Sequence, residues 1–227
     1  MIPQAAAEAD QSIPFGAGKE PGEQGSVEWL YDRVGYCTAS RFKDVMDFTK
    51  AGKPGAKRTA YIWELVIERL TGQPCEHYTS TAMQHGTDNE PLARMAVEAT
   101  GVMVEQTGFI KHPTLAFVGG SPDGLIDDDS GVEIKCPFNS ANHLQCWLSG
   151  MPEDHMAQIQ GLMWITGRKQ WLFASYDPRM PEKHQLYLQT IERDDEYIAK
   201  LEENIIALLA EVGAIQAQLE AAQDGAI

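Results

Sequence analysis

The chain has 227 residues, 43% of them hydrophobic, and a formal net charge of −15 at neutral pH. This length and composition predict a single domain with a substantial core, and no apolar run approaches the roughly 20 residues that a membrane span needs. The first residues lack the basic start and apolar middle of a secretory signal, so we expect a cytoplasmic protein.

The N-terminal 25 residues are rich in Ala, Gly, Pro and Gln and contain few large apolar side chains. Such a composition buries too little apolar surface to order the chain. We therefore expect residues 1–25 to be a flexible segment and residues 26–227 to form one domain. Four cysteines are scattered without a C-x-x-C pair, which argues against a structural zinc site and predicts reduced, buried thiols.

A helix start near residue 40 is a candidate anion site. Thr38 or Ser40 can cap a helix that continues through Phe42 and Met46. Free amide groups at a helix start, a serine hydroxyl and the nearby Arg33 together suit a phosphate. A plain cap beside a surface arginine explains the same residues, and the pattern leaves both interpretations open.

Residues 41–58 carry six basic side chains against two aspartates, in a chain that is otherwise strongly acidic. A basic patch on an acidic body would hold DNA at one place and repel it elsewhere. An ordinary solvated loop has the same composition. The Gly/Lys-rich part of this segment, residues 50–59, is typical of a mobile functional loop.

Two helices are predicted next. Residues 60–71 have apolar side chains at helical spacing. The second helix is expected to begin at the capping-box pair Thr87 and Glu90, with Pro91 in its first turn, and to end at Gly101. Glu90 therefore has a structural explanation as a cap partner. It also lies on a helix that precedes the acidic stretch described below, where a third carboxylate could reach a metal or its water.

Short strands separated by Gly, Pro and Asp turns are predicted between residues 102 and 136, and they indicate an antiparallel meander. The expected strands cover residues 102–105, 108–111, 115–119 and 132–136. The last of them ends before a proline, which cannot donate to a strand ladder.

The stretch SPDGLIDDDSGVEIKCP contains the strongest candidate site. Side chains alternate along a strand, so Glu133 and Lys135 share one face, Ile134 points into the core, and the preceding turn places Asp123 nearby. Carboxylate oxygens suit Mg²⁺ or Mn²⁺, and a lysine beside them can orient or deprotonate a water and stabilise charge on a phosphate oxygen. A surface hairpin with a solvated Glu/Lys face is the alternative that this pattern alone leaves open.

Beyond the acidic stretch we expect a short helix at residues 144–148, a helix at 153–165, and strands at 170–176 and 185–191. In the second helix Gln158 points away from the apolar side. Its amide can donate to a phosphate or to a carboxylate ligand, and a merely solvated glutamine is the alternative. A last helix at residues 194–222 has apolar residues at heptad spacing. It can pack on its own domain or on a neighbouring subunit.

Several motifs occur in one order along residues 23–200: EQGSVEW, TAS, HGTDNEP, SPDG, VEIKCPF, HMAQIQ, MWIT and YDPRM. Together they resemble the YqaJ-like viral recombination nucleases, the PD-(D/E)xK family that includes the exonuclease of phage lambda. The resemblance implies an α/β fold with a PD-(D/E)xK nuclease-like core, in which helices flank a central mixed β-sheet and a long C-terminal helix follows.

The resemblance also implies residue roles. The metal ligands are Asp123, Glu133 and the carbonyl of Ile134, the catalytic lysine is Lys135, and the cofactor is Mg²⁺, two ions per active site, with Mn²⁺ as a substitute. Six further positions match residues near the active site or the DNA. They are Glu90 and Gln158 as auxiliary active-site residues, Arg33 and Ser40 at the 5′-phosphate, Met83 as an apolar wedge between strands, and Lys50 as a loop contact with DNA.

The implied function is a Mg²⁺-dependent 5′–3′ exonuclease that degrades one strand of linear duplex DNA from a 5′-phosphorylated end. It would leave a 3′ overhang for single-strand annealing recombination in the cytoplasm of a bacterial host. The implied assembly is a ring-shaped homotrimer that acts with a single-strand annealing recombinase, and no membrane partner is expected. Two alternatives stay open: an endonuclease with the same motif, and a non-catalytic DNA-binding assembly protein.

Overall fold

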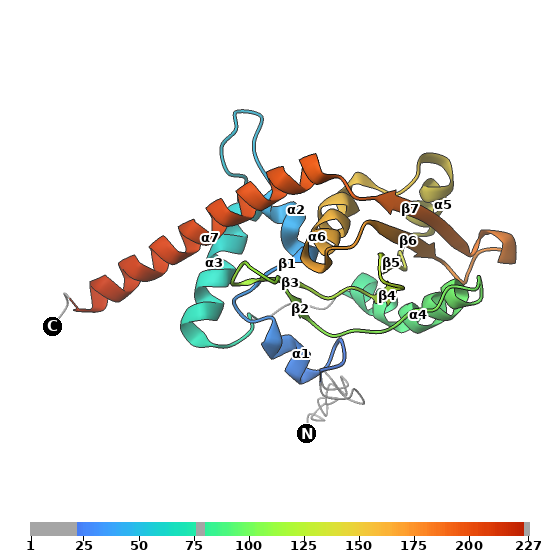
Figure 1. The fold of residues 1–227 in the computed structure, drawn as a ribbon, viewed down its shortest axis with the longest axis horizontal. Coiled ribbons are helices and arrows are strands. Elements are labelled where there is room, and N and C mark those ends of the chain that lie inside the picture. Colours follow the sequence, from blue (N-terminus) through green and yellow to red (C-terminus); the bar gives the residue numbers. More distant parts are fainter. Residues whose placement is uncertain (1–21, 76–79, 225–227) are drawn as a thin grey trace, which may run out of the picture.

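Two mixed β-sheets surrounded by helices make up the described chain, and one long helix projects at its C-terminal end (Figure 1). A computed structural model describes residues 22–75 and 80–224. The predicted α/β class with a central mixed sheet, flanking helices and a long last helix is confirmed. The flexibility predicted for the N-terminal segment falls mostly on residues 1–21, which lie outside the described part.

The larger sheet has the strand order β4-β5-β6-β7. Its strands are β4 (Gly124–Ile126), β5 (Ser130–Lys135), β6 (Gln170–Tyr176) and β7 (Leu186–Glu192). Only β5 and β6 run parallel, which requires the long helical crossover between them. In this pairing Glu133 lies opposite Phe173 and Lys135 lies opposite Ser175.

The smaller sheet has the order β1-β3-β2 and corrects the predicted meander. Its strands are β1 (Cys37–Thr38), β2 (Ile110–Lys111) and β3 (Val118–Gly120). Strand β3 pairs antiparallel with β2 and parallel with β1, which comes from far upstream. The strand predicted at residues 102–105 was wrong: only a single bridge forms there, between Glu105 and Leu125.

Helices cover both faces of the larger sheet (Figure 1). The helices of the described residues are α1 (Val27–Asp32), α2 (Phe42–Val45), α3 (Ala56–Thr71), α4 (Thr81–Glu98), α5 (Ser140–Ser149), α6 (Met156–Thr166) and α7 (Asp195–Asp224). Three short 3₁₀ turns accompany them: η1 (Ala39–Arg41), η2 (Glu153–His155) and η3 (Glu182–His184).

Helix α4 begins two turns earlier than predicted. Ser80 is its N-cap, and the Ser80 hydroxyl accepts a hydrogen bond from the Met83 amide at 3.2 Å. Thr87 therefore lies inside the helix, where its hydroxyl donates to the Met83 carbonyl, and Pro91 is also internal. The capping-box prediction was wrong, because an earlier serine offers an equivalent cap. Glu90 therefore takes no part in capping α4.

The alternating side chains of β5 and β6 separate two cores. Trp171 and Phe173 face a large apolar cluster built with α2, α3, α6 and α7. Val132 and Ile134 face the opposite side, toward α4. Odd-numbered residues of β5, including Glu133, share the Trp171 side because the two strands pair in register.

Gly131 on β5 lies flat against the ring of Trp171. A Cβ atom at this position would be 2.4 Å from Cη2 of the buried indole. We expect Gly131→Ala to lower the free energy of unfolding by about 1–3 kcal/mol, because the rigid ring and its packed neighbours must move. Chemical denaturation measures this change. Gly213→Ala in α7 is the matched control: no atom lies within 4 Å of its added Cβ, so we expect stabilisation by about 1 kcal/mol. Equal stabilities of wild type and Gly131→Ala would contradict the packing.

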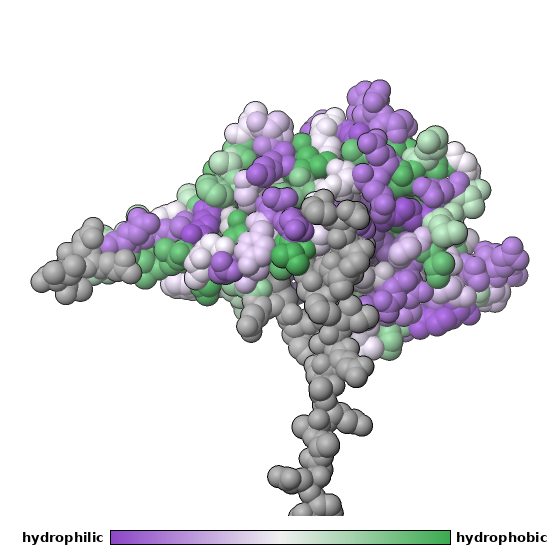
Figure 2. Space-filling model, turned by 90° about the horizontal axis from the view of Figure 1, so that it is seen from below, coloured by the Kyte–Doolittle hydropathy of each residue, from purple (hydrophilic) through white to green (hydrophobic). Residues whose placement is uncertain are grey.

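The heptad face of α7 packs on its own domain through Val212. Leu201, Ile205, Leu208 and Val212 are fully buried. Farther on, the helix leaves the body, and Leu219 is 41% exposed. Figure 2 shows hydrophobic side chains along this projecting arm.

Helix α7 also corrects an expectation about membranes. Its segment Asp195–Ala222 meets the length and composition of a membrane span. An 18-residue window within it has a mean hydropathy of 1.4, and 17% of that window is buried. The lack of a long continuous apolar run in the sequence predicts no segment of this kind. It is one helix among the described residues, and its inner face packs on the domain core.

All four cysteines are free thiols. Cys37, Cys136 and Cys146 are buried, as predicted, whereas Cys75 is only half-buried. Burial raises the pKa of Cys37 and of Cys136 to about 12, so both thiols stay protonated at neutral pH.

Candidate active site

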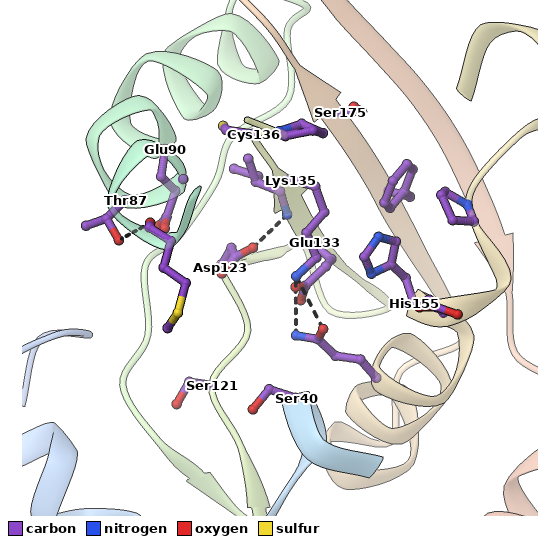
Figure 3. Close-up of a pocket in the computed structure, with 18 of the residues that line it drawn as sticks. Ser40, Thr87, Glu90, Ser121, Asp123, Glu133, Lys135, Cys136, His155 and Ser175 are labelled. Atoms are coloured by element: carbon purple, nitrogen blue, oxygen red, sulfur yellow. Dashed lines mark hydrogen bonds and ion pairs between the residues drawn. The ribbon is translucent and has the colours of Figure 1, made fainter. Parts of the chain in front are cut away.

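A cleft of about 780 Å³ lies where β5, α4, α6 and the start of η1 meet (Figure 3). Its polar lining comes from segments far apart in the sequence, because the two sheets and the crossover bring them together. Eight of the nine predicted site residues with side-chain roles line this cleft. They are Arg33, Ser40, Met83, Glu90, Asp123, Glu133, Lys135 and Gln158.

Asp123 is held in place by a main-chain hydrogen bond. It lies in the three-residue link between β3 and β4, and its Oδ2 accepts from the Ile134 amide at 2.6 Å. The side chain is 8% exposed. Burial raises the pKa of Asp123, while the ammonium group of Lys135 acts in the opposite direction. The link thus fixes this carboxylate against the end of β5.

Glu133 and Lys135 point to one side of β5, as the alternation predicts (Figure 3). The Lys135 ammonium group donates to Glu133 Oε1 at 2.5 Å and to Gln158 Oε1 at 3.3 Å. Gln158 Nε2 donates to the same Glu133 oxygen at 2.7 Å. Each of the three side chains therefore orients the other two. Ile134 is 5% exposed and points into the opposite core, as predicted.

The charge balance of this cluster favours a cation. Burial, followed by the neighbouring Asp123 carboxylate, raises the pKa of Glu133 to about 8. Burial also lowers the pKa of Lys135, but the two carboxylates outweigh it and the net shift is upward. Two buried acids share one lysine, so additional positive charge would relieve the repulsion between them.

The oxygen donors suit a divalent metal with an incomplete set of protein ligands. Glu133 Oε2 is buried and accepts no hydrogen bond from any described residue. Ile134 also lines the cleft and has a main-chain carbonyl. Among the described residues no three His, Cys, Asp or Glu side chains gather into a closed metal site. Mg²⁺ commonly binds one or two carboxylates and takes its other ligands from water and phosphate, so the residues present fit this ion.

Glu90 and Met83 reach the cleft from α4. Glu90 Oε1 accepts from Arg94 at 2.7 Å, one helical turn away. Met83 lies in the first turn of the same helix and is 55% exposed. An acid and an exposed apolar side chain thus lie on one wall, opposite α6.

A second polar group in the same cleft is the candidate anion subsite predicted from the sequence. Arg33 donates to the Ser40 hydroxyl at 3.4 Å, and its guanidinium lies 4.1 Å from the ring centroid of Trp29. The Trp29 indole donates to the Ser121 hydroxyl at 2.8 Å. Trp29 therefore connects the arginine to the link that carries Asp123.

The cleft residues that sequence reasoning missed include Gln24, Trp29, Ser121 and His155. His155 stacks on Phe173 at 5.6 Å between ring centroids. Burial, and then the charge of Lys135, lowers its pKa to about 4, so the imidazole is neutral at pH 7. Gln24 hydrogen bonds Asp123, although it belongs to the segment that we expected to be flexible.

Lys50 does not line the cleft. It is exposed in the loop between α2 and α3, which the bridge from Phe48 to Pro54 closes. This loop protrudes from the body (Figure 1). A contact between Lys50 and DNA stays a prediction.

Comparisons with known proteins identify the family of the chain. A family model described as a YqaJ-like viral recombinase domain matches residues 28–169. An alkaline exonuclease of Laribacter hongkongensis, LHK-Exo, is 40% identical with a TM-score of 0.80, and the match covers 88% of this chain and 99% of that one. A structure of LHK-Exo in complex with dAMP gives 41% identity and a TM-score of 0.81 over the same shares.

Two further matches are weaker: one has low sequence identity and the other covers a short segment. A phage-related exonuclease of Haemophilus somnus 129PT shares the fold, with a TM-score of 0.65 and 17% identity over 81% of this chain and 96% of that one. The protein ExoD of Escherichia coli (strain K12) is 43% identical over 51 residues, which are 22% of this chain and 58% of ExoD. The match thus spans little more than half the length of ExoD.

The family model covers more than half of the chain, and LHK-Exo is matched over nearly its whole length. The resemblance recognised in the sequence motifs is confirmed. The chain belongs to the YqaJ-like viral recombinase domain family.

Proposed function

We propose that the protein is a Mg²⁺-dependent 5′–3′ exonuclease that degrades one strand of linear duplex DNA and leaves a 3′ overhang. One observation carries the proposal: the buried Asp123, Glu133 and Lys135 cluster and the Arg33 anion subsite line the same cleft. A carboxylate pair with a lysine suits phosphodiester hydrolysis, and an anion subsite beside it suits the terminal phosphate of a DNA end.

The metal-binding residues in this proposal are Asp123, Glu133 and the carbonyl of Ile134, with two Mg²⁺ ions per site or Mn²⁺ in their place. Bound Mg²⁺ supplies Lewis acidity toward the phosphate and lowers the pKa of water. Asp123 and Glu133 stay ionised in its presence. Lys135 orients water and stabilises negative charge on the phosphate oxygens, and Gln158 fixes the lysine and the glutamate relative to each other.

The proposed 5′–3′ polarity rests on the Arg33 subsite, which lines the same cleft as the acids. Arg33 and Ser40 would hold a 5′-phosphate, while Asp123 and Glu133 act on the neighbouring phosphodiester. Glu90 is the auxiliary carboxylate from α4, and Met83 separates the strands at the cleft. The name of LHK-Exo, an alkaline exonuclease, supports this class of reaction, and its complex with dAMP holds a nucleoside monophosphate, the kind of product that such hydrolysis leaves.

We further propose a ring-shaped homotrimer that acts with a single-strand annealing recombinase in the cytoplasm of a bacterial host, without a membrane partner. The net charge of −15 would disfavour DNA binding to an open surface. Enclosure by a ring would keep the enzyme on DNA without a basic body. Lys50, exposed in its loop, would then contact the duplex.

The test uses linear duplex DNA labelled separately at each 5′ end and a closed circle of the same sequence, both with Mg²⁺. We expect mononucleotides from the 5′ ends of the linear substrate, a growing 3′ overhang, and an intact circle. Denaturing electrophoresis resolves these products. Cleavage of the closed circle would contradict the exonuclease and favour the endonuclease alternative, and no hydrolysis of either substrate would favour the assembly protein.

Arg33→Gln is the matched variant for polarity. Wild type should digest a 5′-phosphorylated end faster than a 5′-hydroxyl end, by about tenfold for one charge-assisted pair. Arg33→Gln should digest both ends at the slower rate. A phosphate preference that persists in Arg33→Gln would contradict the role of the anion subsite.

A further inference from the structure

The loop that follows β5 presents an aromatic side chain beside the cleft. Pro137 lines the cleft, and the next residue, Phe138, is 51% exposed. Phe138 meets the ring of His85 edge-to-face, with centroids 5.5 Å apart and planes at 83°. His85 lies in the turn of α4 that contributes Gly86 and Thr87 to the cleft wall.

An ion pair between the buried Asp177 and the partly exposed Arg179 fixes the backbone of this loop. One guanidinium nitrogen of Arg179, Nη2, donates hydrogen bonds to the carbonyl oxygens of Pro137 and Phe138, at 3.1 and 3.0 Å. The same guanidinium donates twice to Asp177, at 2.7 and 2.9 Å, and Asp177 is fully buried. Asp177 also closes the turn by accepting from the Arg179 amide at 3.0 Å.

The Phe138 ring is half-exposed and contacts His85 at one edge, while Arg179 holds the backbone that carries it, so the ring is positioned before a ligand binds. Contact of the apolar ring with water is unfavourable, so burial of the ring against a ligand would lower the free energy. Fixing the ring before binding lowers the entropy that a ligand must overcome. Every nucleobase has a flat apolar face, so a fixed aromatic ring beside a DNA cleft suits an unpaired base.

We propose that Phe138 stacks an unpaired base of the strand that enters the cleft, and that Arg179 is its positioning residue. The proposal rests on the proposed action on DNA. It adds a base-binding position on the α4 side of the cleft, separate from the Arg33 subsite and from the metal-binding acids. Stacking does not distinguish bases, so this position accepts any sequence.

The test is abasic scanning without hydrolysis. Single-stranded 5′-phosphorylated oligonucleotides, each lacking one base at a different position, are bound to the full chain in EDTA and followed by the anisotropy of a 3′ dye. For wild type we expect one position near the 5′ end at which loss of the base weakens binding about tenfold. In Phe138→Leu the penalty at that position should vanish, and in Phe138→Trp it should persist.

Arg179 is tested against an arginine with similar main-chain contacts elsewhere. Arg168 donates to the carbonyls of Ile126, Asp127 and Ser130, at the other end of β5. Arg179→Met should reduce the abasic penalty as Phe138→Leu does, whereas Arg168→Met should leave it at the wild-type size even where it lowers Tm. Trp63→Leu, at a 48% exposed aromatic on α3, should also leave it unchanged.

An identical abasic profile for wild type and Phe138→Leu would overturn the proposal. The same profile together with a smaller oligomer in sedimentation would assign Phe138 to a subunit contact instead. Normal digestion of linear duplex by wild type in either case leaves the proposed function standing. A wild type that neither binds nor digests DNA would refute both.

Discussion

Asp123→Asn and Glu133→Gln will each reduce hydrolysis of linear duplex by about 10³-fold or more. Each substitution removes one negative charge from the buried pair and keeps the size of the side chain. Under the proposed function, the loss of a carboxylate ligand would weaken the metal site that activates water and stabilises the transition state. Single-turnover digestion measures the rate, and calorimetric titration with Mg²⁺ or Mn²⁺ measures the accompanying loss of metal affinity.

Asp129→Asn is the matched control for these acids. Asp129 lies just before β5, is 52% exposed, and pairs with Lys169. We expect wild-type rates and metal affinity from Asp129→Asn. Without divalent cation and above pH 8, where Glu133 is ionised, both active-site variants should unfold at or above the wild-type temperature, because each relieves repulsion between buried carboxylates. Hydrolysis by Asp123→Asn at the wild-type rate would contradict the assignment of Asp123 to the active site.

Lys135→Met will lower the catalytic rate constant by about 10²–10³-fold while Mg²⁺ affinity changes little. The Lys135 ammonium group contacts both Glu133 and Gln158 and reaches the cleft with a side chain that is 29% exposed. Its loss removes the positive charge that stabilises the phosphate in the transition state. The acids proposed to bind metal stay in place. Pre-steady-state digestion at saturating DNA separates this defect from weaker binding.

Lys169→Met is the control for the lysine. Lys169 forms an ion pair with Asp129 at 2.9 Å, and its side chain is 72% exposed at the opposite end of the sheet. Because exposed pairs contribute little, we expect unchanged kinetics and stability. If Lys135→Met lost Mg²⁺ affinity in parallel with rate, the lysine would act by organising the metal site, and the assigned role in the transition state would be wrong.

Local patterns predicted the centre of the fold well. Strand β6 has the predicted bounds, and the alternation along β5 places Glu133 and Lys135 on one face, with Ile134 on the other. These features depend on the geometry of one extended segment and on burial of its apolar side. Neither needs knowledge of distant partners.

Features that depend on distant partners were missed. The two residues of β1 have no signal of their own and become a strand only by pairing with β3. The start of α4 was misplaced because Ser80 and Thr87 both fit a helix cap, and packing rather than sequence decides between them. The same holds for Trp29, whose link to Ser121 spans 92 positions. The motif EQGSVEW contains this tryptophan and was the available signal.

The link from Ser121 to Asp123 is short and is held at both ends. Between β3 and β4 only three residues intervene, one of them a proline, and the Trp29 indole and the Ile134 amide hold the two ends. The anion subsite and the carboxylates therefore cannot drift apart independently. Under the proposed function, the same bond would be cut in every cycle, because the contacts of Trp29 with Arg33 and Ser121 would fix the distance from the terminal phosphate to the carboxylates.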